Sequence, residues 1–174
     1  MLTLVLSARL YKRRGLSRIF VFILKLKHFM LLKEVKMNIK DSEIKQIMSQ
    51  YKKFCVLGLS PDSSKPSQGV PVFMRSKGWD IVGVYPGKNE INGFNIYADL
   101  SQVPAEYRKF VDVFRRPEHI PAVVDEIIAV GGVEVLWLQL GISHPEAEKK
   151  AEAAGIKVIS NRCLHIEYER FFKE

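Results

Sequence analysis

The amino-acid sequence predicts an α/β fold with a doubly wound, mainly parallel sheet of five to six strands, flanked by helices in three layers. Short apolar segments alternate along the chain with segments of helical periodicity. Turns that contain glycine and proline separate the two kinds of segment. Strands that alternate with helices pair in parallel through right-handed crossovers, and 174 residues fit one domain.

The first two elements are an amphipathic helix and a buried strand. The helix follows Met37 and places Ile44, Ile47 and Met48 on one face. Residues 54–57 form a short apolar run of the kind that makes a strand buried on both faces. Gly58 ends this strand, a polar loop reaches residue 67, and a helical run follows over about residues 70–77.

Two strands and a longer helix occupy the middle of the chain. Residues 79–85 and 110–114 are apolar and predict strands. Pro117 suits the first position of the helix that follows. Apolar residues then recur at spacings of three and four from Ile120 to Ile128, and two glycines from residue 131 end the helix.

The last third continues the alternation of strands and helices. Residues 133–140 predict a strand that Gly141 ends. Ser143 and Glu146 fit a capping box, with Ser143 as the cap and Glu146 reaching back, and this helix ends at Gly155. Residues 156–159 predict the last strand, and residues 163–172 the final helix.

The carboxyl ends of the predicted strands carry basic residues. Ligands of doubly wound sheets bind beyond these ends, at the point where the strand order reverses. Five basic side chains follow the strand ends: Lys65, Lys88, Arg115, Arg116 and Arg162. The turn at Gly58 and the helix start after it also aim backbone N–H groups at one point, which favours an anion. We therefore expect an anionic ligand with more than one phosphate.

The common nucleotide and hydrolase motifs are missing from the first turn. Ser60 and Ser63 replace the second and third glycines of G-x-G-x-x-G, and no Walker sequence occurs. Pro61 follows Ser60 directly, so the G-x-S-x-G elbow is also missing. The second strand lacks the acidic residue that would bind an NAD ribose, and Lys88 stands there instead. A cation at that point favours a ribose phosphate.

Five motifs in order resemble the small stand-alone CoA-binding proteins, a Rossmann-like family similar to the nucleotide-binding domain of the succinyl-CoA synthetase alpha subunit. They read GLSPDSSKPS at 58–67, VYPGK at 84–88, DVFRRPE at 112–118, LWLQLG at 136–141 and NRCLHIE at 161–167. The resemblance implies that residues 58–60 approach the CoA pyrophosphate. It implies that Lys88 meets the phosphorylated adenosine end, and that residues 139–141 line the pantetheine side.

From the strand ends and this resemblance together we expect CoA to contact fifteen residues. They are Gly58, Leu59, Ser60, Ser64, Lys65, Ser67, Lys88, Phe114, Arg115, Arg116, Gln139, Gly141, Asn161, Arg162 and Cys163.

The expected function is non-catalytic binding of CoA or acyl-CoA in the cytoplasm. The four histidines are scattered, and no metal pattern or catalytic set is readable. The resembling synthetase works through a phosphorylated histidine in a second domain and a partner subunit, and this chain has no counterpart of that domain. Alternatives are an NAD(P)-dependent enzyme, a CoA-ligase component that acts with another chain, or a CoA-free interaction protein.

The two cysteines predict a reducing compartment, because they form no disulfide framework. Cys55 lies within the first strand and is expected to be a buried small hydrophobe. Cys163 begins the final helix on the ligand edge. A packing role is the favoured interpretation of this thiol, and formation of a mixed disulfide with CoA is the alternative.

The net charge of +8 comes from the first 36 residues, which hold nine basic residues and one acidic residue. Residues 37–174 are neutral, which argues against nucleic-acid binding, and we expect no membrane contact of this domain. The favoured interpretation is a start at Met37, with the CoA-binding domain over 37–174 and an extension over 1–36. A membrane-surface helix or a transit peptide is the alternative for the extension.

Overall fold

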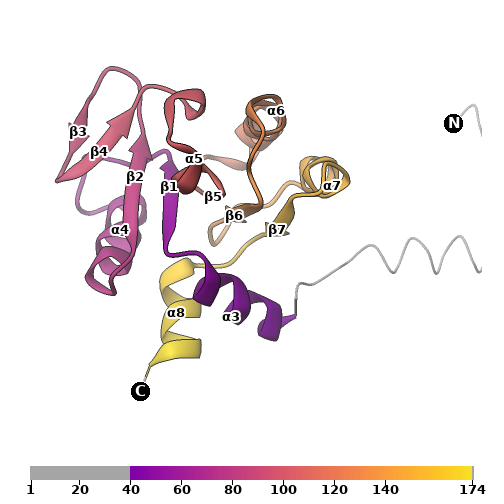
Figure 1. Cartoon of the computed structure of the whole chain (residues 1–174), viewed down its shortest axis with the longest axis horizontal. Coiled ribbons are helices and arrows are strands. Elements are labelled where there is room, and N and C mark those ends of the chain that lie inside the picture. The colour runs from indigo at the N-terminus through magenta and orange to yellow at the C-terminus, as the bar shows by residue number, and fades with distance from the viewer. Residues whose placement is uncertain (1–39, 174) are drawn as a thin grey trace, which may run out of the picture. The chain divides into compact units, whose positions relative to one another are not determined.

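The computed structural model describes residues 40–173, and Figure 1 shows a central sheet with helices on both faces. The sheet of this region has seven strands in the order β3-β4-β2-β1-β5-β6-β7. All neighbouring strands pair in parallel except β3 and β4. The doubly wound α/β prediction is confirmed, with more strands than expected. The predicted boundary after residue 36 lies outside the described residues.

The elements of the described region have the following bounds. The strands are β1 (Lys53–Leu57), β2 (Asp80–Val84), β3 (Glu90–Ile91), β4 (Phe94–Tyr97), β5 (Phe110–Val113), β6 (Val135–Leu138) and β7 (Lys157–Ile159). The helices are α3 (Asp41–Gln50), α4 (Pro66–Ser76), α5 (Ala105–Arg108), α6 (Ile120–Val130), α7 (Pro145–Ala153) and α8 (Leu164–Phe172). Two short 3₁₀ turns are η1 (Leu100–Gln102) and η2 (Pro117–His119).

The central strand β1 pairs with β2 on one side and with β5 on the other. Its last residue, Leu57, stands opposite Val84 of β2 and Val113 of β5. The chain continues from β1 to β2 in one direction along the sheet, and β5, β6 and β7 extend in the other. The strand order therefore reverses between β1 and β5, where ligands of such sheets bind.

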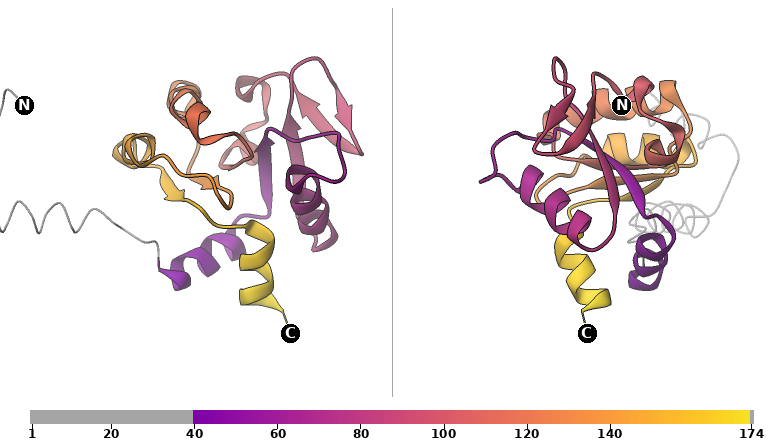
Figure 2. Two further views of the ribbon diagram at one scale, coloured as in Figure 1. Left: turned by 180° about the vertical axis from the view of Figure 1, so that it is seen from behind. Right: turned by 60° about the vertical axis from the view of Figure 1, so that its left-hand side comes forward.

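The sheet separates two apolar cores because successive side chains point to opposite faces. Cys55 and Leu57 pack with α6 and α7 on one face. Phe54 and Val56 pack with α3, α4 and α8 on the other, and Figures 1 and 2 show this division of the helices. The second core is aromatic: the Phe110 ring centroid lies 5.4 Å from that of Phe54 and 6.0 Å from that of Trp137.

The two unexpected strands form a hairpin at the edge of the sheet. Asn92 and Gly93 connect β3 to β4 with φ angles of 49° and 77°. Positive φ at both positions is the type I′ geometry that Asn-Gly favours, so this dipeptide is the sequence signal that our prediction missed. The Asn92 amide donates to the Pro61 carbonyl over 3.1 Å, and Arg75 donates to the Gly93 carbonyl over 3.0 Å. The hairpin therefore holds the loop that follows β1.

Three helix starts differ from the predictions. Pro117 begins the 3₁₀ turn η2, so α6 starts only at Ile120, and proline explains the other two starts. Helix α4 begins at Pro66, earlier than residue 70, because proline is preorganised for the first helical turn. Helix α7 begins at Pro145, so its cap is His144, and the expected cap at Ser143 is wrong. The residue that reaches back is Glu148, which accepts the His144 N–H over 2.7 Å, and not Glu146.

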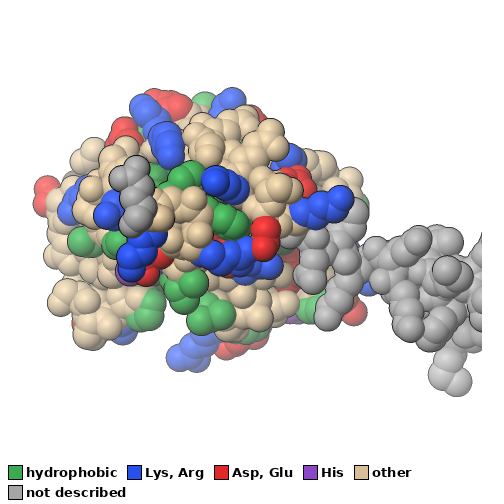
Figure 3. Space-filling model, turned by 90° about the horizontal axis from the view of Figure 1, so that it is seen from below, with side chains coloured by type: hydrophobic (Ala, Val, Ile, Leu, Met, Phe, Trp, Pro, Cys, Tyr) green, Lys and Arg blue, Asp and Glu red, His purple; other side chains and the backbone are tan. Residues whose placement is uncertain are grey.

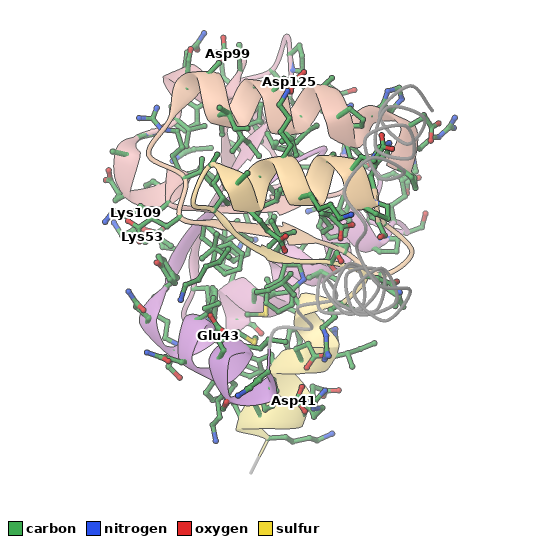
Figure 4. The ribbon with its side chains drawn as sticks, turned by 90° about the vertical axis from the view of Figure 1, so that its right-hand side faces the viewer. Asp41, Glu43, Lys53, Asp99, Lys109 and Asp125 are labelled. Atoms are coloured by element: carbon green, nitrogen blue, oxygen red, sulfur yellow. The ribbon has the colours of Figure 1, made fainter. Side chains whose placement is uncertain are left out.

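The outer surface of the described region carries dispersed ion pairs. Figure 4 shows Asp99 and Asp125 at one end of this domain, and Asp41 and Glu43 at the other. Asp125 pairs with Lys150 on α7, and Asp41 pairs with Arg170 on α8. Exposed pairs of this kind contribute about 0–1 kcal/mol each. The cores and the parallel ladders therefore supply most of the stability.

A small cavity of about 440 Å³ lies between α4 and α8. Aromatic rings and lysines share its walls, which are formed by Phe73, Lys77, Tyr168, Glu169, Phe172 and Lys173. Seen from the end where α8 finishes, hydrophobic side chains lie among Lys and Arg side chains (Figure 3).

Within the described residues, no helix is long and apolar enough to cross a bilayer.

Candidate functional site

A cavity of about 550 Å³ lies at the carboxyl ends of β5, β6 and β7. We call it the apolar groove. Its walls come from the first turns of α4 and α8 and from the segments that follow β5 and β6. The lining residues are Lys65, Pro66, Ser67, Val70, Phe114, Arg115, Arg116, Pro117, Gln139, Leu140, Ile142, Cys163 and Ile166.

A second cavity, of about 390 Å³, lies at the carboxyl ends of β1 and β2 against α6. We call it the α6 cavity. Its lining residues are Leu57, Val84, Pro86, Ala98, Asp99, Arg115, His119, Ala122, Val123 and Glu126. Arg115 lines both cavities, so they adjoin at the switch point between β1 and β5. Together they form one elongated candidate site across the carboxyl ends of the strands, where ligands of such sheets bind.

Positive charge gathers where the two cavities adjoin. Lys65 caps α4, whose first turn contains no acidic residue, so the partial positive charge of the helix start is not neutralised there. Arg115 and Arg116 extend from the end of β5. Arg116 approaches Glu118 only to 3.9 Å, and its side chain is 83% exposed. This part of the site favours an anion.

The loop between β1 and α4 is held by its own hydrogen bonds. The Ser60 hydroxyl accepts the Asp62 N–H over 3.1 Å. Ser64 donates both its N–H and its hydroxyl to the Asp62 carboxylate, over 3.0 and 2.7 Å. These bonds hold the pKa of Asp62 below its usual range, so the loop carries a negative charge at neutral pH. The positive charge of this region therefore lies at the start of α4 and on Arg115, and not at the tip of the loop.

Gly58 is required by the fold at the end of β1. Its φ of +93° is unfavourable for residues with a side chain, and a Cβ there would lie 2.6 Å from the Phe114 carbonyl oxygen. The next residue, Leu59, is fully buried in the aromatic core. The absence of a side chain at residue 58 thus allows the backbones that follow β1 and β5 to lie in close contact. This requirement comes from the fold and does not depend on a ligand.

A buried chain of polar groups forms the floor beside the apolar groove. The Gln139 amide donates to Asp112 Oδ1 over 2.8 Å, and its oxygen accepts the Leu164 N–H over 3.3 Å. Asp112 is fully buried, and its Oδ2 has no partner among the described residues. Burial raises the pKa of Asp112 to about 7, against the opposing hydrogen bond from Gln139. This chain fixes the start of α8 against β5 and β6.

The segments after β6 and β7 are tied to each other. The Gly141 N–H donates to the Asn161 side-chain oxygen over 2.8 Å. The Trp137 indole donates to the Arg162 carbonyl over 2.7 Å. The Arg162 guanidinium lies 2.9 Å from Glu167 and 3.6 Å from Asp41, so it is paired within the protein. These contacts shape the wall of the groove and leave Arg162 outside its lining.

The structure brings seven of the predicted site residues together in the apolar groove: Lys65, Ser67, Phe114, Arg115, Arg116, Gln139 and Cys163. Gly58, Leu59, Ser60 and Ser64 belong to the turn and loop after β1, whereas Gly141, Asn161 and Arg162 do not line the groove. Lys88 is exposed in the segment after β2, two residues beyond Pro86, which lines the α6 cavity.

Sequence reasoning missed the apolar part of the groove and the α6 cavity. Ile142 and Ile166 line the groove although neither was predicted as a site residue, and Leu140 was expected there only as part of the segment 139–141. The spacing of Cys163 and Ile166 at a helix start places both on one face, a signal that could have identified Ile166. His119 and Glu126 line the α6 cavity from η2 and α6. Within residues 40–173 no group of three or more His, Cys, Asp and Glu side chains is arranged to hold a metal ion.

Residues 52–169 match the family model described as "CoA binding domain". The chain is 30% identical over 129 residues to the uncharacterised protein YneT of Bacillus subtilis (strain 168), an alignment that covers 74% of this chain and 94% of the relative.

Two solved structures share the fold. A hypothetical protein from Pyrococcus horikoshii OT3 has a TM-score of 0.71 at 30% identity, and the alignment covers 77% of this chain and 93% of that one. A structure titled cell-free ID.343 from Thermus thermophilus has a TM-score of 0.69 at 35% identity, over 77% of this chain and 100% of that one.

A pair of glycine substitutions tests the contact at Gly58. Gly58→Ala should lower the free energy of unfolding by about 1–3 kcal/mol more than Gly87→Ala, because the added methyl group meets a backbone carbonyl. Gly87 also has positive φ, 79°, but a Cβ there has no neighbour within 4 Å. The control therefore measures backbone strain alone, about 1–2 kcal/mol. Urea denaturation gives both values, and equal losses would contradict the close approach.

Asp112→Asn should change how stability depends on pH. The folded pKa of about 7 lies above the ordinary 3.8, so the stability contributed by the protonated carboxyl is complete below about pH 4 and is lost as pH rises through 7. The asparagine cannot ionise, and its unpaired amide imposes a cost that does not vary with pH. The stability of the variant relative to the natural protein should therefore rise by about 1–3 kcal/mol from pH 5 to pH 8. Urea denaturation across that range measures it, and a constant difference would contradict it.

Proposed function

Because this chain belongs to the CoA-binding domain family, we propose that it binds coenzyme A across the carboxyl ends of its strands. The observation that carries the proposal is the pair of cavities that adjoin at Arg115. CoA has a nucleotide half and a pantetheine half joined by a pyrophosphate. Two cavities with a cationic junction suit a ligand built in that way.

The pyrophosphate would lie at the junction of the two cavities. Arg115 lines both, Lys65 caps α4, and the start of this helix favours negative charge. Arg116 stands next to Arg115 with a largely exposed side chain that can turn toward a phosphate. The internally bonded loop of Ser60, Asp62 and Ser64 holds the start of α4 in place beneath the ligand.

The adenosine half would occupy the α6 cavity. Pro86, Ala98 and Ala122 offer apolar surface for a flat base, and His119 offers a ring for stacking or a hydrogen bond. Asp99 and Glu126 already accept hydrogen bonds from the backbone of residues 100–102, so they hold this wall in shape. Lys88 follows Pro86 closely and is the proposed partner of the 3′-phosphate.

The pantetheine half would extend from the junction along the apolar groove toward Cys163. We propose a binding protein without chemistry of its own, working in the reducing cytoplasm, where both cysteines remain thiols. Any reaction of the bound CoA would then be catalysed by another protein, one that delivers the ligand to this chain or receives it.

The main test compares CoA with dephospho-CoA. CoA should raise the melting temperature, with about 2.7 kcal/mol of stabilisation at a concentration of 100 times Kd. Lys88→Ala should weaken CoA binding by about 1.5–3 kcal/mol, the value of a charged hydrogen bond, and dephospho-CoA binding far less. Lys149→Ala removes an exposed charge from α7 and should change neither.

Titration calorimetry gives the dissociation constants. Equal losses for both ligands in Lys88→Ala would remove Lys88 from the site. A protein stabilised by NADP but not by CoA would contradict the proposed function.

A second test locates the pantetheine thiol. Incubation with oxidised CoA should attach one CoA to Cys163, because its thiolate attacks the ligand disulfide, the new Cys163–CoA disulfide forms, and one CoA thiolate leaves. Burial raises the pKa of the Cys55 thiol and makes it the internal control. Intact-mass spectrometry should show the adduct in Cys55→Ser and lose it in Cys163→Ser. An adduct that survives Cys163→Ser would place the thiol end elsewhere.

A further inference from the structure

The apolar groove changes in character from one end to the other. Arg115 and Arg116 follow β5, whereas Leu140 and Ile142 follow β6, the next strand of the sheet. Ile166 faces the groove from α8, beyond the end of β7. Positive charge thus stands at the switch point, and apolar side chains stand farther along the same edge. We call this farther part the distal end of the groove.

Two large apolar side chains at the distal end are exposed to water. Leu140 is 63% exposed and Ile166 is 54% exposed. A single exposed leucine or isoleucine is ordinary on a protein surface, but here both line one cavity. Covering them with hydrocarbon would remove apolar surface from water at about 25 cal/mol per Å². The distal end therefore favours an apolar ligand group.

The polar groups around the distal end are already paired within the protein. The Gln139 side chain bonds to Asp112 and to the Leu164 N–H. The Asn161 oxygen accepts the Gly141 N–H, and the Asn161 N–H donates to the Ile142 carbonyl over 3.1 Å. A ligand at this end meets few free donors or acceptors. A polar group there would lose its bonds to water without replacement, whereas a hydrocarbon chain would lose nothing.

We propose that the distal end of the groove holds the hydrocarbon chain of an acyl thioester, so that the preferred ligand is an acyl-CoA with an apolar acyl group. This inference rests on the proposed function, because it needs the pantetheine half in the groove. The charged junction at Arg115 then binds the phosphates, and the distal end selects the group carried on the sulfur. Free CoA would occupy the charged junction and the adjoining groove, and would leave the distal end empty.

The test is a series of dissociation constants for CoA, acetyl-CoA, butyryl-CoA and hexanoyl-CoA, measured by titration calorimetry with a reductant present. Affinity should rise about two- to fourfold for each added methylene until the chain extends past the groove. Ile166→Ser should flatten the series, measured as the ratio of the CoA to the hexanoyl-CoA dissociation constants. Ile128→Ser is the matched control, since Ile128 is 37% exposed on α6 and does not line the groove.

Leu140→Ser provides a second variant on another element, and circular dichroism checks that each variant is folded. A flat series with measurable CoA binding would overturn the acyl inference and leave the proposed function standing. Failure of every CoA compound to bind would overturn the proposed function itself. An equal change in Ile166→Ser and Ile128→Ser would also overturn the inference. Free hexanoate bound as tightly as hexanoyl-CoA would assign the distal end to fatty acids instead.

Discussion

The whole site depends on the close approach of two backbones at the centre of the sheet. Beyond the last paired residues of β1 and β5, the Phe114 N–H donates to the Leu57 carbonyl over 2.9 Å, and the Phe114 carbonyl fills the space where a side chain at residue 58 would stand. The chain then leaves β1 toward α4 on one face and β5 toward α6 on the other. Arg115 follows directly after this point and lines both cavities.

The position of α8 depends on polar groups buried in an otherwise apolar core. Asp112, Gln139 and the Leu164 N–H form one chain of bonds, and the Trp137 indole holds the Arg162 carbonyl beside it. An apolar core alone would leave the rotation of a short helix loosely defined, whereas directional bonds fix it. The cost is a carboxylate oxygen without a partner in the described region. In return, Cys163 and Ile166 face the groove from a rigid wall.

The alternation of apolar runs and helical periodicity was sufficient to predict the parallel sheet and which strand ends share one edge, because both follow from local pattern and chain connectivity. The direction in which a side chain points cannot be predicted from local pattern and connectivity. Arg162 follows a strand end as predicted, but its guanidinium pairs with Glu167 and with Asp41 of α3, which is distant in the sequence. Leu140 was included only as part of the segment 139–141, and Ile166 was not predicted, because an exposed apolar residue carries no signal of its own until the cavity around it is known.

The hydrogen bond between the edge hairpin and the loop after β1 depends on an asparagine that can lose its amide slowly with time. The Asn92 side chain donates its amide N–H to the Pro61 carbonyl, and glycine follows it in a tight turn. Loss of that amide as ammonia would convert the donor into a carboxylate, which can only accept. Two acceptors would then face each other, and the hairpin would release the loop that supports the start of α4. An aged molecule would keep its sheet and its cores while losing the hydrogen bond that ties the hairpin to the loop before α4.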